Sequence, residues 1–218
     1  MGENMEKEYL SEFKINMRDV KKHYVHRKKV SLQLKNLLKT KKIEEYVRLA
    51  VGITDPLGNY SAHEHQLGPR ILNNNSIISI FKFAQQLESK NLEVTDLPKI
   101  IYDADLAYCK ISVGSEMASM LRPNHFWVGN VRTIWSHLVI KHKGDSEKAN
   151  EELELYQIGD ASSEMRYQIW REIYLSMQHS LDIINTISKT WAEQQEIKPG
   201  KLKYIWIDAV CNGLYEFE

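Results

Sequence analysis

The stretch SEMRYQIWREIYLSMQHSLDIINTISKTWAEQQ, residues 163–195, decides the fold class of this chain. Apolar side chains recur along it at spacings of three and four residues, which is the period of one face of an α-helix. A run of this length predicts a long amphipathic helix that is either the core helix of a bundle or a seam between two chains, and we favour the core helix. The stripe consists of Met165, Ile169, Ile173, Met177, Leu181, Ile184, Ile187 or Ser188, and Trp191.

Helical periodicity also dominates the rest of the chain. The sequence therefore predicts an all-α helical bundle with one long heptad-like C-terminal helix, as a single domain that forms a dimer. In this domain a basic helical arm or hairpin, residues 1–52, packs on a bundle formed by residues 76–218. The turn-rich segment 54–75 predicts a long loop, and residues 109–114 predict a short extended piece. The other predicted helices span residues 6–26, 30–51, 76–89, 115–121, 126–142, 146–156 and 204–214, and a further helix begins after Thr95.

The composition narrows the class of protein. With 43% hydrophobic and 27% charged residues, 10 Gly and 5 Pro, the chain is typical of a globular protein and not of a disordered one. The two cysteines, Cys109 and Cys211, do not make a disulfide framework or a zinc knuckle, so we expect reduced thiols. The sequence shows neither a signal peptide nor a membrane-spanning run, which predicts a cytoplasmic protein without a membrane partner.

Charge is unevenly distributed, although the net charge is +0. Between Lys14 and Lys42 there are eleven Lys or Arg residues and one acid, Asp19. Such a basic segment attracts phosphate backbones, so we predict RNA or another nucleic acid as a partner. The alternatives are a solvated helix face, or an arm that docks on the acidic half of a partner subunit. The predicted nucleic-acid-binding residues are Lys21, Lys22, Arg27, Lys28 and Lys29.

The motif VRTIWSHL contains the candidate catalytic residues Arg132 and His137. RNA carries its own nucleophile, the 2′-hydroxyl, so cleavage needs a general acid or base of near-neutral pKa and a cation that stabilises the charge on the phosphate. Histidine and arginine supply these two roles. At this spacing the two side chains lie about 140° apart on a helix, so one copy does not readily aim both at one phosphate, whereas a dimer could.

This R-x4-H motif on a helix resembles the signature of the HEPN superfamily. The resemblance implies a metal-independent endoribonuclease that works as a dimer in toxin or antiviral defence systems, without a metal or other cofactor. Active members commonly have Asn, Asp or His after the arginine, whereas this chain has Thr133. A second R-x4-H match, Arg18 to His23, lies in the basic segment, and we favour Arg132 and His137.

Other interpretations stay open. Arg132 and His137 could be structural residues that border the apolar stripe and pair with an acid such as Glu116. The chain could then be a non-catalytic nucleic-acid-binding subunit, or a helical protein–protein interaction module. His63 and His65 lack a third ligand at a known spacing and are interpreted as an exposed loop rather than as a metal site. Glu151, Glu152 and Glu154 are interpreted as solvated helix positions.

Overall fold

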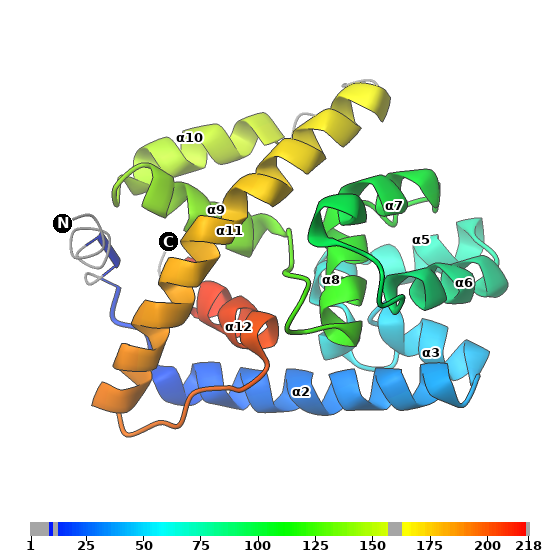
Figure 1. Ribbon diagram of the computed structural model, residues 1–218, viewed down its shortest axis with the longest axis horizontal. Helices are drawn as coiled ribbons and strands as arrows, with labels where there is room; N and C mark the ends of the chain where they lie inside the picture. The colour runs from blue at the N-terminus through cyan, green and yellow to red at the C-terminus, as the bar shows by residue number, and fades with distance from the viewer. Residues whose placement is uncertain (1–8, 11–12, 157–162, 217–218) are drawn as a thin grey trace. The chain divides into compact units, whose positions relative to one another are not determined.

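The computed structural model describes residues 9–10, 13–156 and 163–216, and every regular element in this part of the chain is a helix (Figure 1). The prediction of an all-α protein is confirmed. None of the described helices is both long and apolar enough to cross a membrane. The α-helices are α2 (Met17–Lys39), α3 (Ile43–Ala50), α4 (Tyr60–Glu64), α5 (Leu67–Asn74), α6 (Ile77–Leu87), α7 (Leu97–Asp103), α8 (Ile111–Leu121), α9 (Val131–Lys141), α10 (Ser146–Tyr156), α11 (Ser163–Gln194) and α12 (Lys203–Tyr215). The 3-10 helices are η1 (Pro56–Gly58) and η2 (Val94–Asp96).

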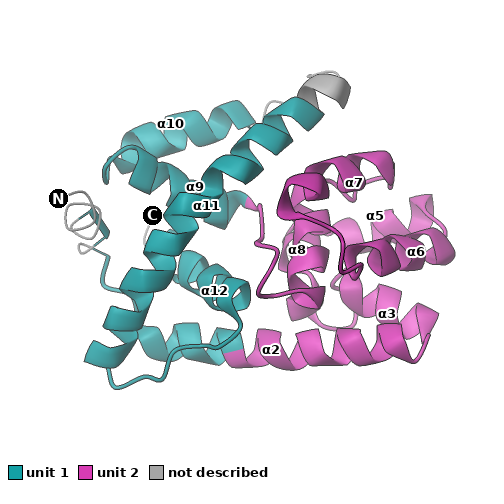
Figure 2. Cartoon of the chain, viewed as in Figure 1, with its two compact units in different colours: residues 1–24, 131–218 teal, residues 25–130 magenta. Residues whose placement is uncertain are grey.

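The chain divides into two compact units, which Figure 2 distinguishes by colour. Unit 1 consists of residues 1–24 and 131–218, and unit 2 consists of residues 25–130. Helix α2 begins in unit 1 and ends in unit 2. The predicted arm, residues 1–52, is therefore shared between the units, and a single domain stays a prediction.

Unit 1 is built around α9, which packs against α10, α11 and α12. Helix α11 turns the central part of its predicted stripe into this core, as a bundle helix would. Pairing of α11 with a second chain stays a prediction, and the side chain of Met165 lies outside the described residues. The buried stripe residues are Ile173, Met177, Leu181, Ile184, Ile187 and Ser188.

Unit 2 is built around α8, which packs against α4, α6 and α7. Gly114 allows the close approach of α7, because a Cβ atom at this position would lie 2.8 Å from Cγ1 of Ile101. The expectation of an extended piece at residues 109–114 was wrong, since α8 begins at Ile111. Near the end of α8, the backbone carbonyl of Met120 accepts a hydrogen bond of 2.6 Å from the hydroxyl of Ser31. This bond connects α8 to α2.

The predicted long loop at residues 54–75 was also wrong, because η1, α4 and α5 occupy most of it. The residues that indicated turns instead cap these helices. The Asp55 carboxylate accepts from the backbone N–H of Leu57 at 2.9 Å, and the Asn59 side chain accepts from Ala62 N–H at 3.0 Å. A capping residue and a loop residue have the same amino-acid preferences, so the sequence pattern did not separate them.

Helix boundaries in the N-terminal part differ from the prediction of two helices, 6–26 and 30–51. One helix, α2, runs through the intervening residues, because these contain no glycine or proline and include two good helix-forming lysines. The break comes later, at Lys41, whose φ of 55° is left-handed. The predicted helical residues 6–8 and 11–12 lie outside the described part of the chain.

The C-terminal helices α10, α11 and α12 lie close to their predicted positions. Helix α9 begins at Val131 rather than at Phe126. The segment before α9 is not helical and is held by a hydrogen bond instead. The backbone N–H of Gly129 donates to the Ser115 hydroxyl at 2.8 Å.

Each unit contains one cysteine. Cys109 belongs to unit 2 and Cys211 to unit 1, and both are free and buried. Burial raises the pKa of each thiol to about 12. Both side chains therefore stay protonated at neutral pH, which makes them poor nucleophiles.

Candidate functional site

The predicted catalytic residues Arg132 and His137 both lie on α9, in the core of unit 1. Their exposed fractions are 8% and 6%, respectively. The Arg132 guanidinium lies 5.9 Å from the centre of the Tyr215 ring of α12, whereas the His137 ring faces serines of α11. The two side chains are thus directed at different helices, as their angular separation on α9 requires.

Two hydroxyl groups hold the imidazole of His137. Its Nδ1 atom lies 2.9 Å from Oγ of Ser180, and its Nε2 atom lies 3.3 Å from Oγ of Ser176. Ser180 is buried, whereas Ser176 is exposed, so the Nε2 side of the ring is the one that borders the surface. The pKa of His137 is lowered to about 4, mainly by burial and also by the nearby Lys141 and His142, while Glu152 acts in the opposite direction. The ring is therefore neutral at neutral pH.

Next to His137, the carboxylate of Glu152 collects three donors. It accepts from Lys141 Nζ at 2.6 and 2.8 Å, from His142 Nε2 at 2.7 Å and from the Tyr156 hydroxyl at 2.8 Å. Burial raises the pKa of this carboxyl, but the hydrogen bonds outweigh it and lower the pKa to about 2. The expectation that Glu152 is a solvated residue was therefore wrong. The i, i+4 spacing of Glu152 and Tyr156 was the sequence signal for this cluster.

Arg27, predicted to bind nucleic acid, is fully buried in unit 2 and forms an ion pair with Glu116. It also donates to the carbonyl of Leu57 at 3.2 Å. The structure therefore removes Arg27 from the candidate binding surface. The sequence feature that could have indicated this burial is the position of Arg27 in the apolar stripe of α2. That stripe contains Val20, Tyr24, Val30 and Leu34.

Backbone and hydroxyl groups complete the environment of Glu116. Its carboxylate accepts from the backbone N–H of Tyr60 at 2.7 Å, and from the backbone N–H and hydroxyl of Ser61 at 3.0 and 2.7 Å. Burial raises the pKa of Glu116, but Arg27 and these hydrogen bonds prevail and hold it below its usual value. Glu116, which we considered as a partner for Arg132 or His137, is thus occupied by Arg27.

The four lysines that were predicted to bind nucleic acid are more exposed than Arg27. Lys22, Lys28 and Lys29 are exposed, whereas Lys21 is half-buried and donates to the carbonyl of Lys198 at 2.7 Å. In the unit 2 part of α2, Lys39 is also exposed.

The α2 residues 25–39 contain six cationic or imidazole side chains and no acid. Within the described residues, Lys28, Lys29 and Lys39 form no salt bridge. His26, in contrast, lies 3.0 Å from the Asp55 carboxylate. We define the lysine face as Lys28, Lys29 and Lys39.

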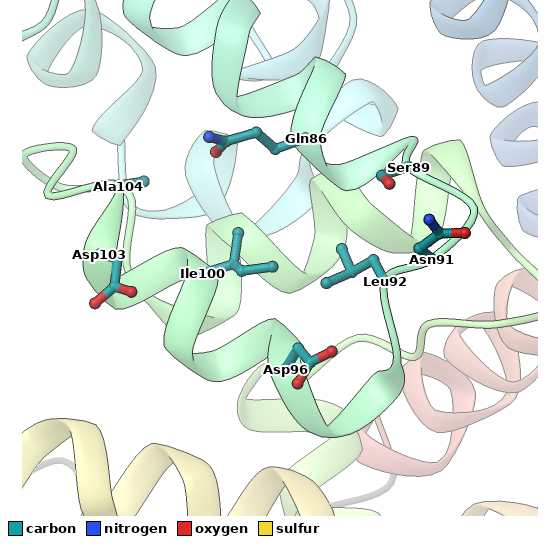
Figure 3. Close-up of a pocket in the computed structure, with 8 residues that line it drawn as sticks. All are labelled: Gln86, Ser89, Asn91, Leu92, Asp96, Ile100, Asp103 and Ala104. Carbon is teal, nitrogen blue, oxygen red and sulfur yellow. The ribbon is translucent and has the colours of Figure 1, made fainter.

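Unit 2 also contains a pocket of about 420 Å³ between the end of α6 and α7 (Figure 3). The sequence pattern does not predict this pocket, because its walls come from the end of α6, the following turn and α7. It is lined by Gln86, Ser89, Asn91, Leu92, Asp96, Ile100, Asp103 and Ala104.

No group of three metal-ligating His, Cys, Asp or Glu side chains occurs in the described ranges. His63 and His65 lie in and directly after α4, and both are exposed.

No family model, curated protein or solved structure matches the chain. The HEPN resemblance and the dimer therefore stay predictions.

Replacement of Arg27 by methionine should lower the free energy of unfolding by about 3 kcal/mol or more, because the carboxylate of Glu116 would remain buried without its cation. Urea unfolding followed by circular dichroism measures this. The control is Lys28→Met at the next, exposed position, which should change the free energy by less than about 0.5 kcal/mol. Equal effects of the two substitutions would contradict the assignment of Arg27 to the core.

Acid should destabilise the protein through His137. Between pH 6.5 and 4 the unfolded chain binds a proton at this residue while the folded protein does not, so stability is lost as pH falls through this window, by about 3 kcal/mol at most. In His137→Gln this contribution is absent. Urea unfolding at pH 7 and pH 4.5 should show a smaller acid-induced loss in the variant, and equal losses would argue against a neutral, buried His137.

Proposed function

We propose that this protein binds RNA through the lysine face of α2. The observation that supports the proposal is the exposure of Lys28, Lys29 and Lys39 on one helix segment that contains no acid. Lysines that are not engaged by carboxylates attract phosphates and release the counterions condensed on the nucleic acid. The attraction does not depend on base sequence.

The spacing of the lysines along α2 also supports this face as the RNA-binding surface. Lys28 and Lys39 are eleven residues apart, which is close to three helical turns, so they project from nearly the same side of the helix. The axial distance between them is about 16 Å. A strand of RNA that follows the helix would therefore meet cations at both ends of the segment, and Lys29 adds a third contact beside Lys28.

Replacement of Lys28, Lys29 and Lys39 by glutamine should weaken binding of a single-stranded RNA oligonucleotide. Loss of three phosphate contacts should reduce the slope of log K against log salt by about 2, since each contact contributes about 0.7 on single strands. Fluorescence anisotropy from 50 to 200 mM salt, roughly the range over which phosphate contacts are screened, measures the slope.

The matched control replaces Lys82, Lys90 and Lys110, which are exposed elsewhere in unit 2, so that the net charge changes equally. If the control loses as much affinity and slope as the lysine-face variant, binding reflects total charge and the proposal fails. Absence of RNA binding by the wild-type protein would also refute it.

RNA cleavage by Arg132 and His137 is a second candidate, favoured by one observation on His137. Its imidazole is neutral at neutral pH and is able to accept a proton, although a pKa of about 4 makes it a weaker base than a histidine of near-neutral pKa. Ser176, an exposed residue of α11, places its hydroxyl 3.3 Å from the Nε2 atom of His137 and 2.8 Å from the carbonyl of Ile173. In this candidate, Arg132 stabilises the charge that develops on the phosphate.

Cleavage in the presence of EDTA should disappear in His137→Gln and in Arg132→Gln, and should persist in His179→Gln, which changes an exposed histidine of α11. The product should end in a 2′,3′-cyclic phosphate. Because the pKa of His137 is about 4, its contribution to the rate should be constant from pH 6 to 8 and fall below about pH 5. Equal activity in all folded variants would assign Arg132 and His137 a structural role.

A further inference from the structure

The pocket between α6 and α7 has a pattern of charge that RNA binding does not use. Asp96, Ile100 and Asp103 are spaced by four and three residues, so they lie along one face of α7. Asp96 precedes the helix, but its φ of −85° and ψ of −22° are helical, which extends the face to it. The Cα atoms of the two aspartates are therefore about 10.5 Å apart along the helix axis, and Ile100 lies between them in the sequence.

Across the pocket from Ile100, the wall is formed by another apolar side chain, that of Leu92. Figure 3 shows the side chains of Leu92 and Ile100 pointing toward each other across the pocket, with the Gln86 carboxamide above them and Asp96 below. No lysine, arginine or histidine belongs to the residues that line the pocket. The volume of about 420 Å³ is within the range of small-molecule sites.

Neighbouring charges leave the acidic character of the pocket in place. One oxygen of Asp96 accepts from the backbone N–H of Glu93 at 3.2 Å. The nearby Arg122 guanidinium is directed at backbone, since it donates to the carbonyls of Ser89 and Leu92 at 2.6 and 3.1 Å.

Lys99 is the cation that competes for this site. Its ammonium lies 2.7 Å from both carboxylate oxygens of Asp103. The Lys99 side chain is 60% exposed and that of Asp103 is 52% exposed. An exposed i, i+4 ion pair of this kind is weak, so a second ammonium ion is able to displace Lys99 or share the carboxylate with it.

We propose that this pocket binds a linear aliphatic polyamine. One ammonium group binds Asp96, another binds Asp103, and the methylene chain between them lies between Ile100 and Leu92. The order of charged, apolar and charged groups in the ligand matches the order of carboxylate, apolar side chain and carboxylate along α7. Phosphate or carboxylate ligands are disfavoured, because both aspartates would repel them.

Ligand length follows from the separation of the carboxylates. The extended chain of a triamine such as spermidine reaches from one aspartate to the other. A monoamine such as n-butylamine, which has the ammonium group and stem of a single lysine side chain, reaches one aspartate at a time. The linked ammonium groups should therefore bind more tightly than the single one, because the second contact is intramolecular.

Isothermal titration calorimetry of the full chain, freed of nucleic acid, tests the proposal with spermidine and n-butylamine. Spermidine should bind at least about tenfold more tightly than n-butylamine. Asp96→Asn and Asp103→Asn should each weaken spermidine binding roughly three- to fivefold, as expected for exposed ion pairs. The control Glu154→Gln, at an exposed acid of α10, should leave binding unchanged.

A substitution that strengthens binding gives the sharpest comparison. Lys99→Gln removes the competing ammonium from Asp103 and should tighten spermidine binding. Lys82→Gln changes the net charge equally at an exposed position of α6 that does not line the pocket, and should not. All five positions are exposed, so circular dichroism should show that the variants are folded.

Four results would overturn the proposal. They are the absence of spermidine binding, equal binding of the two amines, an equal loss in Glu154→Gln and the aspartate variants, and an equal gain in Lys99→Gln and Lys82→Gln. Each would show that amines are attracted, if at all, by the overall charge of the protein and not by this pocket. The outcome does not depend on RNA binding, because no RNA is present.

Discussion

The buried ion pair between Arg27 and Glu116 is the interaction on which the arrangement of unit 2 depends. Removal of two charges from water costs several kcal/mol per ion, and the hydrogen bonds that the Glu116 carboxylate accepts offset part of this cost. Glu116 obtains these bonds from the start of α4, which joins α2, α4 and α8 at one point. Because Arg27 faces inward, the rotation of α2 is fixed, and the neighbouring residues Lys28 and Lys29 project into solvent.

In unit 1 the buried titratable residue His137 is not paired with a charge but is neutral. His137 loses its charge instead of finding a counterion, and serine hydroxyls satisfy its ring nitrogens. Glu152, which lies nearer the surface, keeps its charge because three donors converge on it. A protein core thus accommodates titratable groups by pairing them, neutralising them or leaving them partly solvated, and each choice determines what chemistry remains available at that position.

The sequence predicted what depends on periodicity and missed what depends on distant partners. The stripe of α11 was recognisable because residues such as Met177 and Leu181 repeat with the period of the helix. Arg27 was misassigned because it lies in a basic run, although it falls in the apolar stripe of α2, and its partner Glu116 is 89 residues away in the sequence. The pocket beside α7 was missed for another reason, since it depends on how the turn after α6 brings Leu92 opposite Ile100 of α7.

The distribution of cysteines has a practical consequence. Each compact unit contains one thiol, Cys109 or Cys211, and burial keeps both protonated and shielded from solvent. A thiol-specific reagent can therefore modify either residue only when the surrounding helices open. Since the two residues lie in different units, the rates at which they are labelled report separately on the opening of each unit. The native chain thus contains an internal probe of local unfolding on both sides of the boundary within α2.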